Sequence, residues 1–207
     1  MKNANVPTSI GDTSAPSALG IREKFDFSKF RSAKSNTIEL RPLGVEDVSD
    51  TYLGWLEDPK VNRFLEVRFH KYDLESLRSY VAGFDFKTAF IFGIFSSSKH
   101  IGNLTLYFNP HHGTISFGYI IGDRDYWGSS AATETLVLAL DFAFDHLGAR
   151  KVWGNAYRNN VASIFNFAKF GFVREGVLRG HLIESSGPVD SLVYGLLIEE
   201  WQIVKEK

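Results

Sequence analysis

Hydrophobic residues recur along this chain at two spacings, which separate the expected strands from the expected helices. Alternating apolar and polar residues predict a strand, whereas apolar residues three and four positions apart predict a helix. The clearest helix covers residues 131–147, where Leu136, Leu140 and Phe144 share one face and Gly148 provides a C-terminal stop. Six strands or helices before it and four after it follow from the same two patterns, so secondary structure fills most of the chain.

Together the expected elements describe an α/β protein. In chain order they are a strand at 38–43, helices at 45–58 and 73–84, strands at 88–98, 100–109 and 115–123, a helix at 131–147, a strand at 151–157, a helix at 161–170, and strands at 172–183 and 190–198. The three central strands form an antiparallel meander, because their connections are too short for a crossover helix. Residues 61–72 are expected to form a loop. We therefore predict a mixed, mostly antiparallel sheet of about seven strands with helices on its faces.

The first 36 residues differ in composition from the rest of the chain. Residues 1–36 are rich in Ser, Ala, Asn, Thr, Pro and Gly and show little periodicity, which is typical of a flexible extension. We expect a flexible N-terminal extension over these residues, followed by a single domain over residues 37–207. A domain of that length can enclose one sizeable hydrophobic core.

Composition excludes several kinds of chemistry. The 207 residues include no cysteine, so disulfides, thiolate metal ligands and a cysteine nucleophile are ruled out. The six histidines show no metal-binding spacing, and we predict no metal site. A formal net charge of -1 without long charged runs argues against nucleic-acid binding. No apolar stretch reaches the roughly 20 residues of a membrane span, and the chain start lacks the apolar core of a signal peptide, so we expect a cytoplasmic protein without membrane insertion.

Small residues occupy the junction between an expected strand and the strongest helix. They are Gly128, Ser129, Ser130, Ala131 and Ala132. At such a junction unpaired backbone N–H groups meet the positive end of the helix dipole, an arrangement that binds phosphate groups. Gly and Ser are also common at ordinary helix starts, so the loop alone leaves both interpretations open.

A second segment, over residues 155–180, favours the phosphate-binding interpretation of this loop over an ordinary helix start. Asn160 lies three residues before Ser163 at an expected helix start, and the pairs Gly171-Phe172 and Glu175-Gly176 follow. With Tyr126-Trp127-Gly128 and Ala132-Thr133-Glu134, this pattern over roughly residues 38–201 resembles the GNAT superfamily of N-acetyltransferases. It is most similar to the branch that contains ribosomal-protein N-terminal acetyltransferases and amino-sugar acetyltransferases.

The resemblance implies a fold, a co-substrate and a set of binding residues. In GNAT enzymes the sheet is splayed in the middle, here between the strand ending near Ile121 and the strand at 151–157, and acetyl-CoA lies in the opening. The backbone of residues 117–121 would bind the pantetheine amides, the 127–132 loop would bind the pyrophosphate, and Asn160 would hold the pantetheine or a water molecule. The implied cofactor-binding residues are Phe117, Tyr119, Ile120, Ile121, Trp127, Gly128, Ser129, Ser130, Ala131, Ala132, Asn160 and Ser163.

This chain departs from the family pattern in three places, which are the loop, the position of Phe167 and the position of Ser116. The family loop has Gln or Arg, then Gly, then Gly or Ala, at positions that here hold Trp127, Ser130 and Ala132. Serine keeps the N–H donor but requires ordinary backbone angles where the family has a glycine. The tyrosine that protonates the leaving thiolate in many relatives is Phe167 here, so Ser163 becomes the expected proton donor.

An amine acceptor must lose a proton before it attacks the thioester, so a general base is also expected. The acidic residue that many relatives have before a Gly-Tyr pair is Ser116 in this chain. The replacement candidates are Glu66, His111, His112, Glu184 and Asp190, and we choose Glu66 with Ser163 as the catalytic pair. For each candidate, a solvated or structural role is the alternative. Arg124 and Arg158 flank the expected cleft and would meet either CoA phosphates or solvent.

The tryptophans and most phenylalanines are expected to pack in the core. Aromatic side chains dominate protein interiors, so Trp55, Trp153, Trp201 and most of the 18 Phe residues are assigned there rather than to ligand binding.

The acceptor depends on residues 55–69, which shape the acceptor pocket in the family. Asn62, Arg63, Glu66 and Arg68 offer polar groups there, and this segment and the chain's end resemble enzymes that acetylate nucleotide-linked amino sugars during surface-polysaccharide assembly. We therefore expect an acetyl-CoA-dependent N-acetyltransferase acting on an amino sugar, with a homodimer left open. A protein N-terminal acetyltransferase, antibiotic or polyamine acetylation, and a non-catalytic acyl-CoA-binding module are the alternatives.

Overall fold

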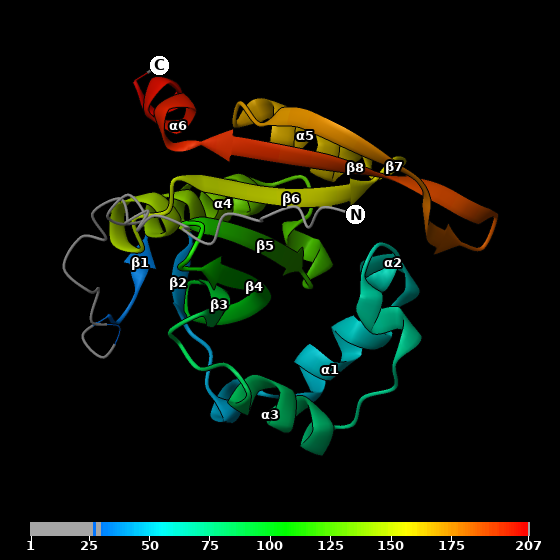
Figure 1. Cartoon of the computed structure of the whole chain (residues 1–207). Helices are drawn as coiled ribbons and strands as arrows, with labels where there is room; N and C mark the ends of the chain where they lie inside the picture. Colours follow the sequence, from blue (N-terminus) through cyan, green and yellow to red (C-terminus); the bar gives the residue numbers. More distant parts are fainter. Residues whose placement is uncertain (1–26, 28–29, 207) are drawn as a thin grey trace, which may run out of the picture.

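The computed structural model describes residue 27 and residues 30–206, and these contain one eight-stranded sheet. The strands are β1 (Ala33–Lys34), β2 (Glu39–Pro42), β3 (Ala89–Ser96), β4 (Lys99–Asn109), β5 (Thr114–Ile121), β6 (Lys151–Tyr157), β7 (Val173–Glu184) and β8 (Gly187–Leu197). Their order in the sheet is β1-β2-β3-β4-β5-β6-β8-β7 (Figure 1), and every neighbouring pair is antiparallel except β5 with β6. The predicted mixed, mostly antiparallel sheet is confirmed.

Six α-helices accompany the sheet within the described residues. They are α1 (Asp50–Glu57), α2 (Pro59–Asn62), α3 (Leu74–Ala82), α4 (Ala131–Asp141), α5 (Val161–Lys169) and α6 (Ile198–Lys205). Short 3₁₀ turns are η2 (Val45–Asp47), η3 (Glu66–Phe69) and η4 (Arg124–Tyr126), and α4 continues into a π-helical turn, η5 (Phe142–His146). No helix in the described part of the chain is long and apolar enough to cross a membrane.

Two of the expected elements differ from the structure, for identifiable local reasons. The helix expected over residues 45–58 begins only at Asp50, because Ser49 adopts an extended conformation and its side chain caps the N–H of Tyr52. The loop expected over residues 61–72 contains the end of α2 and the turn η3. Asp58 explains the new helix: it ends α1, and its side chain accepts a hydrogen bond from Lys60 at the start of α2.

The boundary predicted at residue 37 falls inside the first hairpin of the sheet. β1 lies within the segment 1–36, and it pairs with β2 through Ala33 opposite Leu40 and Lys34 opposite Glu39. The remainder of the expected extension, residues 1–26, 28 and 29, lies outside the described residues. The ordered sheet therefore starts a few residues before the predicted domain.

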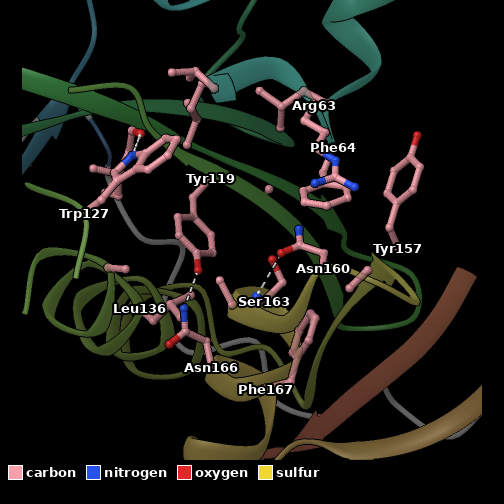
Figure 2. A pocket seen from close by; sticks show the side chains of 18 of the residues that line it. Arg63, Phe64, Tyr119, Trp127, Leu136, Tyr157, Asn160, Ser163, Asn166 and Phe167 are labelled. Atoms are coloured by element: carbon pink, nitrogen blue, oxygen red, sulfur yellow. Dashed lines mark hydrogen bonds between the residues drawn. The ribbon is translucent and has the colours of Figure 1, made fainter. Parts of the chain in front are cut away.

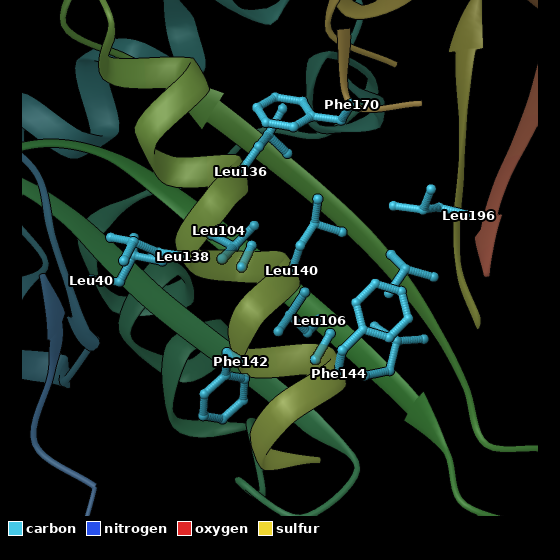
Figure 3. Packing of buried hydrophobic residues seen from close by; sticks show 14 of the residues in the cluster. Leu40, Leu104, Leu106, Leu136, Leu138, Leu140, Phe142, Phe144, Phe170 and Leu196 are labelled. Carbon is cyan, nitrogen blue, oxygen red and sulfur yellow. The ribbon is translucent and has the colours of Figure 1, made fainter. Parts of the chain in front are cut away.

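Helices cover both faces of the sheet and create two hydrophobic clusters. Figure 3 shows α4 laying Leu136, Leu138 and Leu140 against the central strands, next to Leu104 and Leu106. On the opposite face α1 and α3 enclose a second cluster with one side of β3. β3 is buried on both faces, which is why its sequence is apolar almost throughout rather than alternating.

Two of the three tryptophans assigned to the core are there. Trp55 and Trp201 are buried, whereas Trp153 on β6 is 39% exposed, so its assignment is wrong. Side chains alternate across a strand, and the buried neighbours Val152 and Gly154 occupy the core face of β6. Trp153 is therefore on the outer face of the sheet.

The sheet separates in its middle. β5 and β6 pair only through Thr114 with Lys151, Ile115 with Val152 and Ser116 with Trp153. Beyond Ser116 the two strands diverge, and residues 117–121 are paired with β4 on one side only (Figure 1). This gap is the splay that the resemblance implied, and it lies where the chain enters the loop before α4.

Candidate active site

A large cavity of about 900 Å³ occupies the gap between β5 and β6. Its walls are the second half of β5, the loop leading to α4, the end of β6, the first turns of α5 and the segment of α2 and residues 63–66. Figure 2 shows Trp127 and Leu136 at one side, Arg63, Phe64 and Tyr157 at the other, and Asn160, Ser163 and Asn166 between them. Elements far apart in the sequence thus meet at one opening.

The 127–132 loop presents unpaired backbone donors. Among the described residues, no acceptor is found for the N–H groups of Gly128, Ser130 and Ala132. Gly128 has φ of +76°, whereas Ser130 has φ of -73° and ψ of -8°. The expectation that Ser130 takes ordinary backbone angles is confirmed, because Gly128 supplies the left-handed turn instead. Three free donors at the positive end of α4 form a site suited to phosphate oxygens.

Not every residue assigned to this loop lines the cavity. Trp127, Gly128, Ser129 and Ala132 do, but Ser130 and Ala131 do not. Ala131 is buried, and the hydroxyl of Ser130 donates to Glu134 at 2.6 Å. Their side chains therefore shape the loop. The N–H of Ser130 remains available to a ligand, whereas the N–H of Ala131 donates to Ser129 Oγ at 3.2 Å.

The free part of β5 forms the floor of the opening. Phe117, Tyr119, Ile120 and Ile121 all line the cavity, as the resemblance implied. The carbonyl of Ile121 is already engaged, because the indole Nε1 of Trp127 donates to it at 2.8 Å. Trp127 occupies the position where the family has Gln or Arg, and this hydrogen bond holds its indole ring against β5.

Asn160 and Ser163 lie together at the start of α5. Asn160 is the N-cap residue, and its Oδ1 accepts a hydrogen bond from the N–H of Ser163 at 3.2 Å (Figure 2). This bond uses the carboxamide oxygen for capping and leaves the amide nitrogen at the cavity wall. The half-buried Ser163 also lines the cavity, one turn before Phe167.

Glu66 faces Ser163's cavity from the opposite wall. Its Oε1 accepts a hydrogen bond from the hydroxyl of Tyr157 at 3.3 Å, and that hydroxyl in turn accepts one from Arg68 Nη2 at 3.0 Å. Burial and the charge of Glu66 raise the pKa of Tyr157 against the opposing influence of Arg68, so the phenol stays protonated. Tyr157 therefore holds Glu66 at the edge of the opening, and the two catalytic candidates share one cavity.

The other base candidates do not line this cavity. His111 and His112 are in the turn between β4 and β5, at the end of β5 opposite the opening. Glu184 contacts Arg63 and Asn159, and Asp190 forms an ion pair with Arg158 at 2.8 Å.

The two arginines considered for phosphate binding have protein partners. Arg158 is the one paired with Asp190, and Arg124 lies 3.7 Å from Asp58 and over the indole ring of Trp127. Neither one lines the cavity.

Two further residues that line the cavity, Asn166 and Tyr157, were not predicted from the sequence. Asn166 Nδ2 donates a hydrogen bond to the hydroxyl of Tyr119 at 2.7 Å, which bridges β5 and α5 across the opening (Figure 2). The spacing of Asn166 three residues after Ser163 would have placed both on one face of α5, but Tyr157 becomes visible only when α2 and β6 are brought together.

Comparison with known proteins decides the family. The family model described as acetyltransferase (GNAT) domain matches residues 37–173, about two thirds of the chain. The chain belongs to the GNAT acetyltransferase family. Within it, this GNAT protein is 26% identical over 167 residues to the SPbeta prophage-derived uncharacterized N-acetyltransferase YokL of Bacillus subtilis (strain 168), a match that covers 80% of this chain and 93% of YokL. It is 29% identical over 86 residues to the uncharacterized N-acetyltransferase YoaA of the same organism, and there covers 42% of this chain and only 48% of YoaA.

Solved structures show the same fold. A GCN5-related N-acetyltransferase from Brucella melitensis superimposes with a TM-score of 0.70 at 22% identity, covering 85% of this chain and 82% of the other. RimL, a ribosomal L7/L12 alpha-N-protein acetyltransferase solved in complex with coenzyme A, gives a TM-score of 0.72 at 19% identity, covering 80% and 97%.

The GNAT protein is thus an N-acetyltransferase of an acetyl-CoA-dependent family. Its cavity suits that co-substrate, because the free N–H groups of the 127–132 loop match phosphate oxygens and the unpaired edge of β5 matches the amides of a linear chain. Within the described residues, no three His, Asp or Glu side chains come together as metal ligands.

Proposed function

We propose that the protein transfers the acetyl group of acetyl-CoA to the primary amine of an amino sugar or nucleotide-linked amino sugar used in surface-polysaccharide synthesis. The observation that carries the proposal is the cavity, in which a phosphate-type loop, an unpaired strand edge and a carboxylate lie in sequence. The loop binds the pyrophosphate, residues 117–121 bind the pantetheine amides, and Asn160 contacts the pantetheine through its free amide nitrogen.

The chemistry assigns one proton transfer to each side of the cavity. Acetyl-CoA supplies an acyl group activated as a thioester, and the amine nitrogen forms a bond to its carbonyl carbon as the carbon–sulfur bond breaks. Glu66 removes a proton from the amine, directly or through water. The hydrogen bond from Tyr157 holds the Glu66 carboxylate in place for that step. Ser163 donates a proton to the departing sulfur, which Phe167 has no group to do. Positioning the two reactants in one opening provides the largest share of the rate.

The acceptor side of the cavity is polar and carries both signs of charge. Lys60, Arg63 and Glu66 all line it, and the ring of Phe64 lies 4.7 Å from the guanidinium of Arg63 and 5.4 Å, between centroids, from the ring of Tyr157. Cations suit the phosphates and hydroxyl groups of a sugar nucleotide, an aromatic ring suits the apolar face of a sugar, and a carboxylate suits its amine. This combination supports the amino-sugar acceptor.

The test is an acceptor panel read out by release of free CoA thiol. Because the chain contains no cysteine, a thiol reagent reports CoA without background from the protein. The panel includes amino-sugar nucleotides, free amino sugars, peptides with free N-termini, aminoglycosides and polyamines. Thiol release with amino-sugar nucleotides is expected. Thiol release only with N-terminal peptides would show that the acceptor is a protein N-terminus and not an amino sugar. Acetyl-CoA binding without thiol release for any amine would show that the protein is a non-catalytic binding module.

A variant of the base separates the assigned role from simple acceptor binding. Glu66→Gln keeps the shape and the hydrogen bond from Tyr157 but removes the proton acceptor, so kcat should fall about 10²–10⁴-fold while acetyl-CoA affinity is retained. Unchanged kcat would remove Glu66 from the mechanism.

A further inference from the structure

One carboxylate joins the 127–132 loop to the start of the sheet. Glu134, in the first turn of α4, accepts hydrogen bonds from the hydroxyl of Ser130 at 2.6 Å, from the hydroxyl and N–H of Thr37 at 2.9 Å each, and from the hydroxyl of Ser35. Each carboxylate oxygen receives two of these four bonds. Ser35 and Thr37 belong to the turn between β1 and β2, 99 and 97 residues away in sequence.

Glu134 holds Ser130 at two points. Its carboxylate accepts from the serine hydroxyl, and its backbone N–H donates to the serine carbonyl at 2.8 Å. Ser130 is the N-cap residue of α4, yet its side chain caps no backbone N–H and is used for this contact instead. The orientation of the Ser130 peptide, and with it the direction of the free donors beside it, is therefore set by Glu134.

The other end of this contact is rigid. The N–H of Ser35 donates to the carbonyl of Ile38 at 2.8 Å, and Ile38 is buried in the main core. β2 continues from this turn and pairs with β3 over four residues. A side chain held between a packed hairpin and a surface loop transfers the rigidity of the hairpin to the loop.

The charge of Glu134 makes direct ligand binding an unsuitable role for it. Burial opposes its ionisation, but the hydrogen bonds from Ser130, Ser35 and Thr37 outweigh burial and lower its pKa to about 2. An ionised carboxylate repels a phosphate, so its contribution must come from holding the loop. Its own charge is satisfied by the four donors and by the helix dipole.

We propose that Glu134 is a positioning residue that keeps the 127–132 loop in its pyrophosphate-binding geometry by tying Ser130 to Ser35 and Thr37 of the β1–β2 turn. The inference rests on the proposed coenzyme site. It makes the segment just before residue 37, which precedes the matched family domain, part of what determines affinity for acetyl-CoA.

Three variants in the full chain test the proposal. Glu134→Gln replaces two accepting oxygens by one oxygen and a donor, and Thr37→Val removes one donor at the far end of the contact. Glu39→Gln is the control, since Glu39 lies in the same hairpin and pairs with Lys34 at 3.2 Å without contacting the loop. Affinity for CoA is measured by calorimetry, and kcat and KM for both substrates by thiol release.

Glu134→Gln should weaken CoA binding and raise KM for acetyl-CoA about tenfold, the loss of one charge-assisted hydrogen bond. The kcat and the KM for the amine should stay within about twofold, because neither depends on the phosphate contacts. Thr37→Val should also weaken CoA binding and raise KM for acetyl-CoA, but by less. Glu39→Gln should change neither quantity. In a double-mutant cycle, Ser130→Ala and Glu134→Gln should be strongly non-additive.

Three results would overturn the proposal. Unchanged CoA affinity in Glu134→Gln, at wild-type thermal stability, would show that the contact does not position the loop. A general loss in which kcat and both KM values worsen together with the unfolding midpoint, or an additive cycle, would show a merely structural role. Wild-type protein that binds no CoA at all would instead reject the proposed function itself, so the two failures are distinguishable.

Discussion

Gly128 provides a sharp test of the 127–132 loop, because a glycine of the same geometry lies outside the cavity. Gly128 has φ of +76° and Gly148, just after the π-helical turn that ends α4, has φ of +65°. At neither position would an added Cβ come within 4 Å of another group. The replacement of either by alanine therefore costs only the left-handed conformation, about 1–2 kcal/mol, less the roughly 0.4–1 kcal/mol gained by restricting the unfolded chain. Each should lower the unfolding midpoint by about 2–4 °C.

The two substitutions should differ in ligand binding. If the alanine at position 128 relaxes toward negative φ, the neighbouring peptide groups rotate and the N–H of Gly128 no longer points with its neighbours. Losing one hydrogen bond to a charged phosphate costs about 1.5–3 kcal/mol, which is about a 10- to 100-fold rise in Kd for CoA. Gly148→Ala should leave that Kd unchanged, because Gly148 does not line the cavity.

Calorimetry with CoA and thermal unfolding of both variants provide the measurement. Gly128→Val and Gly148→Val repeat the comparison with a larger steric penalty. A β-branched residue at positive φ is a severe outlier, so it forces the backbone to change. Equal CoA affinity in the position-128 and position-148 variants would refute the assignment of the loop. Unchanged stability in all four would refute the backbone argument.

Three further predictions concern the site and the fold. Ser163→Ala should lower kcat about 10²-fold or more with little change in CoA affinity, and an equal loss in both, in steady-state kinetics and calorimetry, would contradict its role as proton donor. Gly122→Ala should lower the free energy of unfolding by about 1–3 kcal/mol in urea denaturation, because a Cβ there would overlap the buried indole of Trp55; a neutral result would mean that the indole moves freely. Glu134, whose pKa is lowered in the fold, stabilises the protein above about pH 4.5 and loses this contribution as pH falls toward about 2, so the difference in unfolding midpoint between wild type and Glu134→Gln should shrink between about pH 7 and about pH 3. A difference that grows on acidification would reverse the sign of that argument.

The sequence predicted the elements whose signals are local. The helix that contains Leu136 and Leu140 shows periodicity over many residues, and the loop before it consists of small residues that are typical of a strand-to-helix junction. The structure has both. Helix α6 was missed because it has eight residues and only Trp201 among them is buried, too few apolar positions for a period to stand out.

Contacts between distant segments could not be predicted in this way. Tyr157 meets Glu66 across 91 residues, and Ser35 meets Glu134 across 99. Neither hydroxyl nor carboxylate carries a local signal of its partner, since such pairs depend on how strands are ordered in the sheet. The histidines at 111 and 112 illustrate the converse: they are close to β5 in sequence, but they lie at the wrong end of that strand.

The gap between β5 and β6 gives this sheet two unpaired strand edges in its interior. An unpaired edge ordinarily recruits a strand from another chain, which is how many β-proteins aggregate. Here the rings of Phe117 and Phe167, 5.9 Å apart between centroids, lie beside the gap where an incoming peptide would need room for its own side chains. A thin, unbranched chain of amides meets no such obstacle. The same rings that leave room for a thin chain therefore disfavour the addition of a further strand at this gap.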